Sequence, residues 1–292
     1  MRVARIREGS GPGGTRAGGA WRGGVARAGK PRRGGRARGG GLLAAAFLAL
    51  ALLAAWELYA RSGGVDDLIL PAPTEVGRAL WEDRDLLWDN FAVTAGEVLL
   101  GLVLALVAAA LLAAALHFSS AVRRAVYPLL VASQTVPIVV VAPLLVVWFG
   151  YDLAPKLAII ALICFFPIVV TALDGLAGID PDLRKLMRTL DAGPWRTFRL
   201  VELPSALPFL LSGARIAVAI AVIGAVLAEQ AGSSEGLGHL LLQATPQLET
   251  ARAYAAVVLL SAFAVALFGG LSLLERLVLP WAHRTRSLGA SQ

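Results

Sequence analysis

Six stretches of about 20 or more mostly apolar residues recur along this chain, and they constrain its fold more than any other feature. A helix of about 20 residues is long enough to cross the hydrocarbon core of a bilayer. Of the 292 residues, 57% are apolar and 16% are charged, whereas about a quarter of a soluble domain is charged. We therefore predict an all-α integral membrane protein with six transmembrane helices, over residues 41–60, 91–116, 126–149, 156–174, 205–229 and 251–274.

The third apolar run differs from the others because prolines interrupt it and polar side chains lie at its centre. These residues are Pro128, Pro137 and Pro143, with Ser133, Gln134 and Thr135 among them. Each proline frees a backbone carbonyl group, which in lipid must find a partner in a neighbouring helix or in a wet cavity. Two interpretations stay open: polar side chains that hold helices together, or residues that line a transport pathway.

The chain begins with a basic, glycine-rich segment. Residues 1–40 hold 11 of the 27 lysines and arginines, and this composition predicts a disordered cytoplasmic tail. The rest of the chain is slightly acidic, so the net charge of +7 does not indicate a nucleic-acid partner. The match of Gly24–Lys30 to the phosphate-binding pattern GxxxxGK is followed by Pro31 where a hydroxyl is needed, so we expect no ATP site. A lone Cys164 and scattered histidines predict no metal or cofactor.

The distribution of basic residues predicts the orientation. Six crossings place both termini on one side, and the segments on that side hold 21 lysines and arginines against five in the opposite segments. Basic residues concentrate in cytoplasmic segments, so we expect a multi-pass protein of the inner (plasma) membrane with both termini in the cytoplasm. Residues 61–90 are then extracytoplasmic and contain a surface helix from Thr74 to Trp88, residues 91–276 form the membrane core, and residues 277–292 form a second cytoplasmic tail.

A cytoplasmic loop over residues 176–204 lies between the fourth and fifth runs, and its first half predicts an amphipathic helix. Asp180 suits the N-cap and Pro181 the first helical position. Four apolar residues follow at helical spacing: Leu183, Leu186, Met187 and Leu190. Asp191, Ala192, Gly193 and Pro194 favour an end to this helix.

A second short helix is predicted from Pro194 to just before Leu203 and Pro204, with Trp195 and Phe198 three residues apart. The apolar stripe of the loop has two interpretations. Either it lies on the membrane surface, or it docks into a groove of a partner protein.

Ionisable residues within the apolar runs are the remaining candidates for function, since charge inside a membrane is costly. Glu97 is expected to face the helix bundle or to pair with a polar group of another span. Glu229, near the outer end of the fifth run, is expected either to act in substrate entry or to reach the interface. Arg215 and Asp174 lie near span ends. No nucleophile, base and orienting group occur together, so an enzyme is not predicted.

The stretch LMRTLDAGPWRTFRLVELPSALP at 186–208 resembles the cytoplasmic EAA loop of permease subunits of ABC importers. Leu203 and Pro204 match its closing pair, whereas Lys185–Met187 stand in place of Glu-Ala-Ala and Asp191 stands in place of a glycine. The segments LPAPTEV at 70–76, APLLVVWFG at 142–150 and SGARIAVAIAVIGAVLAEQAGSSEGLGHLL from residue 212 are similar to the subgroup for sulfonates, taurine, nitrate and thiamine-pyrimidine precursors.

The resemblance implies the type-1 ABC importer (MetI-like) fold and a permease subunit without ATPase activity of its own. It implies as partners a cytoplasmic ABC ATPase dimer, an extracytoplasmic solute-binding protein, a second permease copy and membrane lipid. The substrate would be a small organic anion of the sulfonate, taurine or nitrate kind, or a hydroxymethylpyrimidine-type vitamin precursor, which the VIGAVLAEQAGSSEGLG run favours. An ATP-independent secondary transporter or channel is the alternative.

The resemblance also assigns the site residues. ATPase coupling is expected at Leu183, Leu186, Met187, Leu190, Asp191, Ala192, Gly193, Trp195, Phe198, Leu203 and Pro204. Residues that could line the pathway are Ser133, Gln134, Thr135, Glu97 and Glu229.

Overall fold

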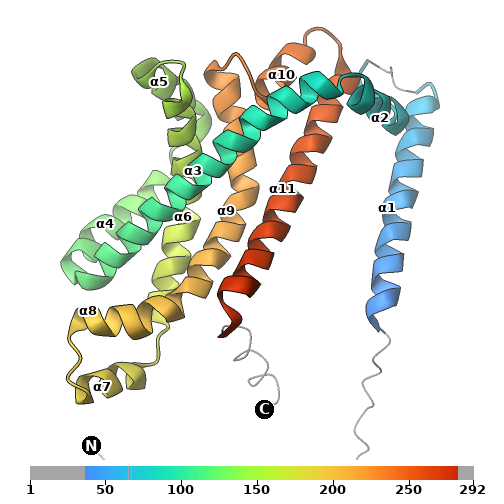
Figure 1. Ribbon diagram of the computed structural model, residues 1–292. Helices are drawn as coiled ribbons and strands as arrows, with labels where there is room; N and C mark the ends of the chain where they lie inside the picture. Colours follow the sequence, from blue (N-terminus) through green and yellow to red (C-terminus); the bar gives the residue numbers. More distant parts are fainter. Residues whose placement is uncertain (1–36, 65, 67, 282–292) are drawn as a thin grey trace, which may run out of the picture. The chain divides into compact units, whose positions relative to one another are not determined.

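A computed structural model describes residues 37–64, 66 and 68–281, with side chains from residue 43 onward, and no strand occurs among these residues. The tail was predicted over residues 1–40, and its residues 1–36 lie outside the described range, as do the last eleven residues of the chain. The chain divides into two units, residues 1–50 and 51–292, and the packing described below is that of the second. The helices are α1 (Ala37–Arg61), α2 (Pro73–Glu82), α3 (Arg84–Phe118), α4 (Ser120–Ser133), α5 (Ile138–Phe149), α6 (Leu153–Ala177), α7 (Pro181–Thr189), α8 (Pro194–Thr197), the π-helical turn η1 (Phe198–Glu202), α9 (Leu203–Gly232), α10 (Leu237–Ala244) and α11 (Thr250–Val278) (Figure 1).

Among the described residues, five helical segments are long and apolar enough to cross a membrane, or six if the bent pair α4–α5 counts as one span. The five are within α1, in α3, in α6, in the continuous helix from Pro194 to Gly232, and in α11. The count of six, in which α4 and α5 form one broken span, agrees with the predicted number of spans. Several helices extend beyond the predicted bounds, and α1 begins at Ala37, inside the segment expected to form the tail.

The third apolar run was expected to be one kinked span, and the structure corrects this. It contains two helices, α4 and α5, whose axes differ by 101°. Pro137 is the N-cap of α5 in an extended conformation, and a proline disfavours helical backbone in the residue before it. Before Pro137 the chain leaves α4 in a turn, in which the N–H of Val136 donates a hydrogen bond to the carbonyl of Ser133 at 3.3 Å. Proline at 137 therefore ends one helix and begins another, rather than bending a single one.

Two further boundaries differ from the sequence-based expectation. The helix predicted from Thr74 to Trp88 is interrupted at Asp83, where α2 ends and α3 begins. At the other end of α3, the predicted runs left residues 117–125 between two spans. The structure reduces this connection to Ser119, whose side chain caps α4 by accepting a hydrogen bond from Val122 N–H at 3.3 Å. Helix α3 is therefore 35 residues long.

The second loop helix was predicted to stop before Leu203, and this is also wrong. α8, η1 and α9 form one continuous helix from Pro194 to Gly232. Within it, Leu203 N–H donates to the carbonyl of Phe198, five residues earlier, which is the π-helical pattern. Pro204 has no N–H to donate to the turn before it. The wider turn lets the chain place this proline in the first turn of α9 without ending the helix.

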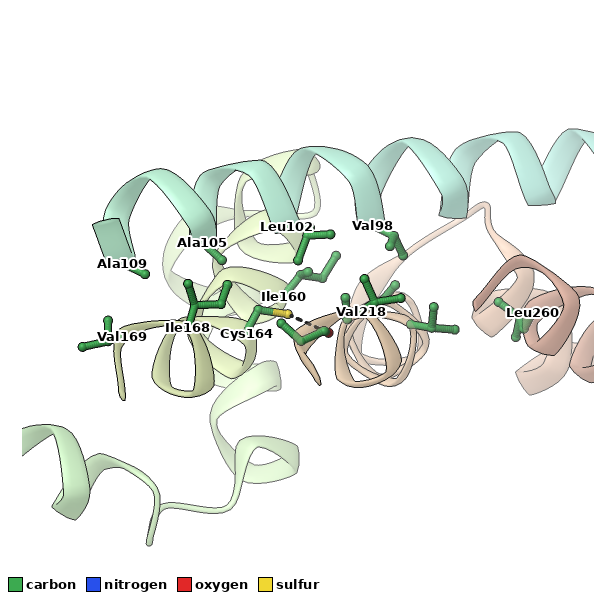
Figure 2. Packing of buried hydrophobic residues seen from close by; sticks show 14 of the residues in the cluster. Val98, Leu102, Ala105, Ala109, Ile160, Cys164, Ile168, Val169, Val218 and Leu260 are labelled. Atoms are coloured by element: carbon green, nitrogen blue, oxygen red, sulfur yellow. Dashed lines mark hydrogen bonds between the residues drawn. The ribbon is translucent and has the colours of Figure 1, made fainter. Parts of the chain in front are cut away.

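The core of the second unit lies where α3, α6 and α9 meet, with α11 packed beside them (Figure 2). Its buried side chains come from all four helices and include Val98, Leu102, Ala105, Ala109, Ile160, Cys164, Ile168, Val218 and Leu260. On α9 the fully buried apolar positions are small: Ala214, Ala217, Ala221, Ala225 and Ala228. Small residues let helix backbones approach closely, and this packing is a main source of helix association in lipid.

Glycines mark close approaches between the helices. A Cβ atom on Gly101 would lie 2.5 Å from Ile160 Cγ2, and one on Gly224 would lie 3.1 Å from Ile163 Cδ1. Both partner residues belong to α6, which is thus held closely by α3 on one side and by α9 on the other.

Candidate functional site

The start of α7 has the predicted capping arrangement. Asp180 accepts a hydrogen bond from the backbone N–H of Asp182 at 2.8 Å, and Pro181 occupies the first turn. The carboxylate of Asp182 also suits the positive end of the helix dipole. The local sequence is therefore sufficient to start the helix at this position.

The end of α7 is formed by the residue that departs from the EAA pattern. Asp191 has φ of 51°, in the left-handed region. Its N–H donates to the carbonyl of Arg188 at 3.0 Å, and the N–H of Ala192 donates to the carbonyl of Met187 at 3.0 Å. These two bonds make a Schellman motif, which usually has glycine at the left-handed position. Asp191 thus adopts the backbone conformation expected of the missing glycine.

The apolar stripe of α7 faces away from the rest of the second unit. Leu183, Leu186 and Leu190 are exposed, and the exposed fraction of Leu190 is 64%. Trp195 on α8 is also exposed, at 65%. Met187 is only half exposed. Together these side chains form an apolar surface, here called the coupling surface, at one end of the second unit (Figure 1).

Other predicted members of the coupling site take different positions. Phe198 is buried and belongs to a cluster of rings: its centroid lies 4.9 Å from that of Phe118 and 5.7 Å from that of Trp195. Leu203 is exposed, but it begins α9 beyond the turn. Phe198 therefore supports the coupling surface from below and does not form part of its exposed face.

Sequence reasoning missed the ionic contacts that hold this region. Glu202 is buried at the end of η1, where its two carboxylate oxygens contact Arg184 Nε at 2.7 Å and His117 Nε2 at 2.7 Å. Arg184 also donates to the carbonyl of Leu176 at 2.9 Å. These residues come from α7, η1, α3 and α6. The sequence feature that could have indicated these contacts is Glu202 itself, a single glutamate in a basic segment directly before Leu203 and Pro204.

The predicted pathway residues Ser133, Gln134 and Thr135 lie at the break between α4 and α5 and are exposed. Ser133 and Gln134 line a cavity of about 430 Å³ together with apolar side chains of α5 and α6, among them Ile138 and Leu162. The cavity therefore combines an apolar wall with a few polar groups, as small-molecule sites do.

The predicted pathway residues Glu97 and Glu229 lie elsewhere, buried between helices. Glu97 accepts a hydrogen bond from Lys156 Nζ at 2.6 Å, which confirms that it pairs with another span, and the same ammonium group donates to Ser233 Oγ at 2.7 Å. Glu229 is 0% exposed, so it does not reach the interface. Its carboxylate accepts bonds from Thr94 Oγ1 at 2.7 Å and from Gly238 N–H at 2.5 Å.

These contacts form a polar network, here called the α10 network, that joins α3, α6, α9 and the start of α10. The hydroxyl of Thr94 also accepts from Leu237 N–H at 2.9 Å, and Asn90 accepts from Gly236 N–H at 2.7 Å. The first N–H groups of α10, which have no partner within their own helix, are thus bound by side chains of α3 and α9.

The two charged residues near span ends are placed differently. Arg215 of α9 lies 3.1 Å from a carboxylate oxygen of Glu275 on α11 and pairs with it, whereas Asp174 is exposed. Within the described ranges, no group of three or more histidine, cysteine, aspartate or glutamate side chains could hold a metal ion.

Comparison with known proteins places these features in a family. The family model of the binding-protein-dependent transport system inner membrane component matches residues 101–280. A probable ABC transporter permease protein of Haemophilus influenzae is 38% identical over 213 residues, 73% of this chain and 87% of that protein. The formylaminopyrimidine transport permease protein ThiX of Halalkalibacterium halodurans is 37% identical over 230 residues, 78% of this chain and 92% of that protein.

A third relative, the riboflavin transport system permease protein RibX of Chloroflexus aurantiacus, is 34% identical over 228 residues, covering 77% of this chain and 85% of that protein. Among solved structures, the crystal structure of an amino acid ABC transporter with histidines matches with a TM-score of 0.54 at 15% identity, over 70% of this chain and 97% of that one. The structural likeness supports the fold alone. The chain belongs to the family of inner membrane components of binding-protein-dependent transport systems.

Proposed function

We propose that, within an ATP-driven importer, the coupling surface of this permease subunit docks on the separate ATPase. The chain is a transport subunit, and ATP hydrolysis in such systems takes place on another chain. The observation that carries the proposal is the exposed apolar stripe of α7. A helix that presents apolar residues at i, i+3, i+4 and i+7 is suited to a groove of a partner.

The two earlier interpretations of the stripe differ in what surrounds it. A helix on the membrane surface needs its apolar face directed toward lipid. In this chain α7 and α8 lie at the same end of the second unit (Figure 1), where the last turn of α3 contacts η1 through His117 and Glu202. The exposed Trp195 extends the apolar surface from α7 onto α8. A surface that continues across a sharp turn between two helices favours a protein groove over a flat bilayer.

Co-purification with the cognate ATPase tests the docking proposal. Leu186→Asp and Leu190→Asp each place a charge on an exposed apolar side chain, so neither disturbs the buried core. We expect both variants to be inserted normally and to lose the ATPase during affinity purification. Ile69→Asp, at a position 70% exposed in the connection between α1 and α2, is the matched control and should retain it. Normal retention by both coupling variants would contradict the proposal.

The pathway is proposed to lie at the break between α4 and α5 and to be completed by a second copy of the chain. Ser133, Gln134 and Thr135 expose polar groups in a region of membrane-spanning helices. The hydroxyls of Ser133 and Thr135 donate to backbone carbonyls of their own turn, at 2.7 and 2.8 Å, whereas the amide of Gln134 has a long contact of 3.4 Å with Ser133 Oγ. An amide in lipid needs further polar partners or a water-filled cavity, and a second copy across the cavity would supply them. Cysteine replacement of Gln134 tests this: a disulfide-linked or cross-linked dimer, and protection of the thiol by transported solute, are the expected results.

The orientation proposed from the sequence places α7 and both termini in the cytoplasm. Support comes from Arg123 and Arg124, which lie in the first turns of α4, directly after the end of α3 that contacts η1. Basic residues of the α3–α4 connection and of the loop that contains α7 therefore lie on the same side, as expected of cytoplasmic segments. A membrane-impermeant thiol reagent should label Arg188→Cys only in opened cells.

For the substrate, we propose a small nitrogen-containing aromatic compound such as a pyrimidine vitamin precursor. The permeases named for formylaminopyrimidine and riboflavin support this class, because both solutes contain such rings. A small organic anion is the alternative that the sequence resemblance implies. Uptake of labelled aminopyrimidine into cells that carry the complete importer, with competition by a sulfonate, distinguishes the two.

A further inference from the structure

Glu202 occupies the point where four helical elements meet. It closes the π-helical turn η1, and its carboxylate is bound on one side by Arg184 of α7 and on the other by His117 of α3. Through Arg184 it is also linked to the carbonyl of Leu176 near the end of α6. Because Glu202 is buried, neither oxygen can exchange these partners for water at low cost.

Helix α7 depends on this contact for its position. None of its residues is buried, and its leucines are exposed on the coupling surface. Among the described residues, Arg184 makes the polar side-chain contacts that tie α7 to other helices. Packing alone therefore holds α7 weakly, and the bonds of Arg184 fix its direction relative to η1 and α3.

A layer of aromatic rings lies beside the ionic contact and joins the same elements. The ring of His117 lies 5.8 Å from that of Phe198, and the ring of Phe118 lies 6.2 Å from that of Trp195. The last turn of α3 thus receives both contacts: the carboxylate of Glu202 through His117, and the coupling surface through Trp195. A displacement of α7 and α8 would reach α3 through these two layers.

We propose that Glu202 is a positioning residue for coupling: it transmits the movement of the ATPase-docking helix α7 to the inner end of α3. This rests on the proposed docking of the ATPase on the coupling surface. Docking itself uses the exposed apolar face, which Glu202 does not touch. Loss of Glu202 should therefore leave the ATPase bound and make its hydrolysis less responsive to the other side of the membrane.

The test uses the complete importer, reconstituted from the chain, its cognate ATPase and its solute-binding protein. Two quantities are measured: the ATPase retained by the permease, and the ratio of ATP hydrolysis with and without binding protein. In Glu202→Gln and in Arg184→Met we expect retention as in the wild type. The stimulation ratio should fall about fivefold or more, the lower range of coupling between distant sites.

Arg188→Met is the matched control, because Arg188 lies one turn further along α7 and is exposed; it should keep the wild-type ratio. The exchanged pair Arg184→Glu with Glu202→Arg should recover part of the stimulation that each single change loses, which a general loss of stability would not produce. An unchanged ratio in both Glu202→Gln and Arg184→Met overturns the inference. A wild-type complex that fails to bind the ATPase overturns the docking proposal instead.

Discussion

Replacing Gly213 by alanine tests how closely α6 and α9 are packed. A Cβ atom at this position would lie 2.0 Å from Thr171 Oγ1, 2.9 Å from Ile168 Cα and 3.0 Å from Pro167 O. The hydroxyl group can rotate away, but the two backbone atoms can move only with helix α6. Overpacking costs about 1–3 kcal/mol, and the contact with backbone places this substitution at about 2–3 kcal/mol.

Gly269→Ala in α11 is the matched control, since its Cβ atom would meet nothing within 4 Å. Both substitutions replace a helical glycine and gain about 1 kcal/mol of helix propensity. The difference between the two variants therefore isolates the steric cost. Adding Thr171→Ala to Gly213→Ala removes the contact with the hydroxyl alone, and we expect it to restore only a minor part of the loss.

Thermal unfolding in detergent measures this difference. For a protein of this size about 1 kcal/mol corresponds to roughly 2–4 °C in Tm, so Gly213→Ala should melt about 4–12 °C below Gly269→Ala. Equal Tm values for the two variants would refute the close approach of α6 and α9. Full recovery by Thr171→Ala would show that the backbone contact has no cost.

Three further predictions concern the polar contacts. Lys156→Met leaves Glu97 buried without its partner and should lower the free energy of unfolding by about 3–5 kcal/mol, while the double change with Glu97→Gln should recover most of it in the same melting assay. Glu229→Met removes both acceptors, and the unsatisfied Gly238 N–H should cost about 1–3 kcal/mol, which loss of protection of the α10 amides from hydrogen exchange would report. Asp191→Gly should stabilise α7 by up to about 1 kcal/mol, because glycine adopts positive φ freely, and this variant should retain the ATPase in co-purification. Asp191→Val should lose the ATPase. Equal retention by both variants would contradict the role of the left-handed turn.

Local signals in the sequence were sufficient for the position of α7 in the coupling loop. The cap at Asp180, the proline after it and the apolar spacing predict α7, because each acts over a few residues. The same holds for the left-handed backbone at Asp191, which its neighbours in the chain determine. The apolar runs likewise predict the number of spans, because length in a bilayer is a local property.

Contacts between distant residues could not be predicted in this way. His117 and Glu202 are 85 residues apart in the chain, and Thr94 and Glu229 are 135 apart. The sequence shows that Glu97 requires a partner, because an unpaired charge in a membrane is costly. It does not show which of the basic residues provides it. The 101° bend at Pro137 was missed for a related reason, since a proline breaks a helix but does not determine the new direction.

The length of α3 has a consequence for how the two ends of the protein can communicate. At 1.5 Å per residue, its 35 residues extend about 52 Å, well beyond the roughly 30 Å of the hydrocarbon core. His117 in the last turn and Thr94 in the α10 network are separated by about 35 Å on this one helix. The helix contains no proline, the commonest cause of a sharp kink. Moved as a rigid body, a tilt of about 5° around His117 would displace Thr94 by about 3 Å, so a small angular change at the contact with Glu202 becomes an atomic-scale shift at the opposite end of α3.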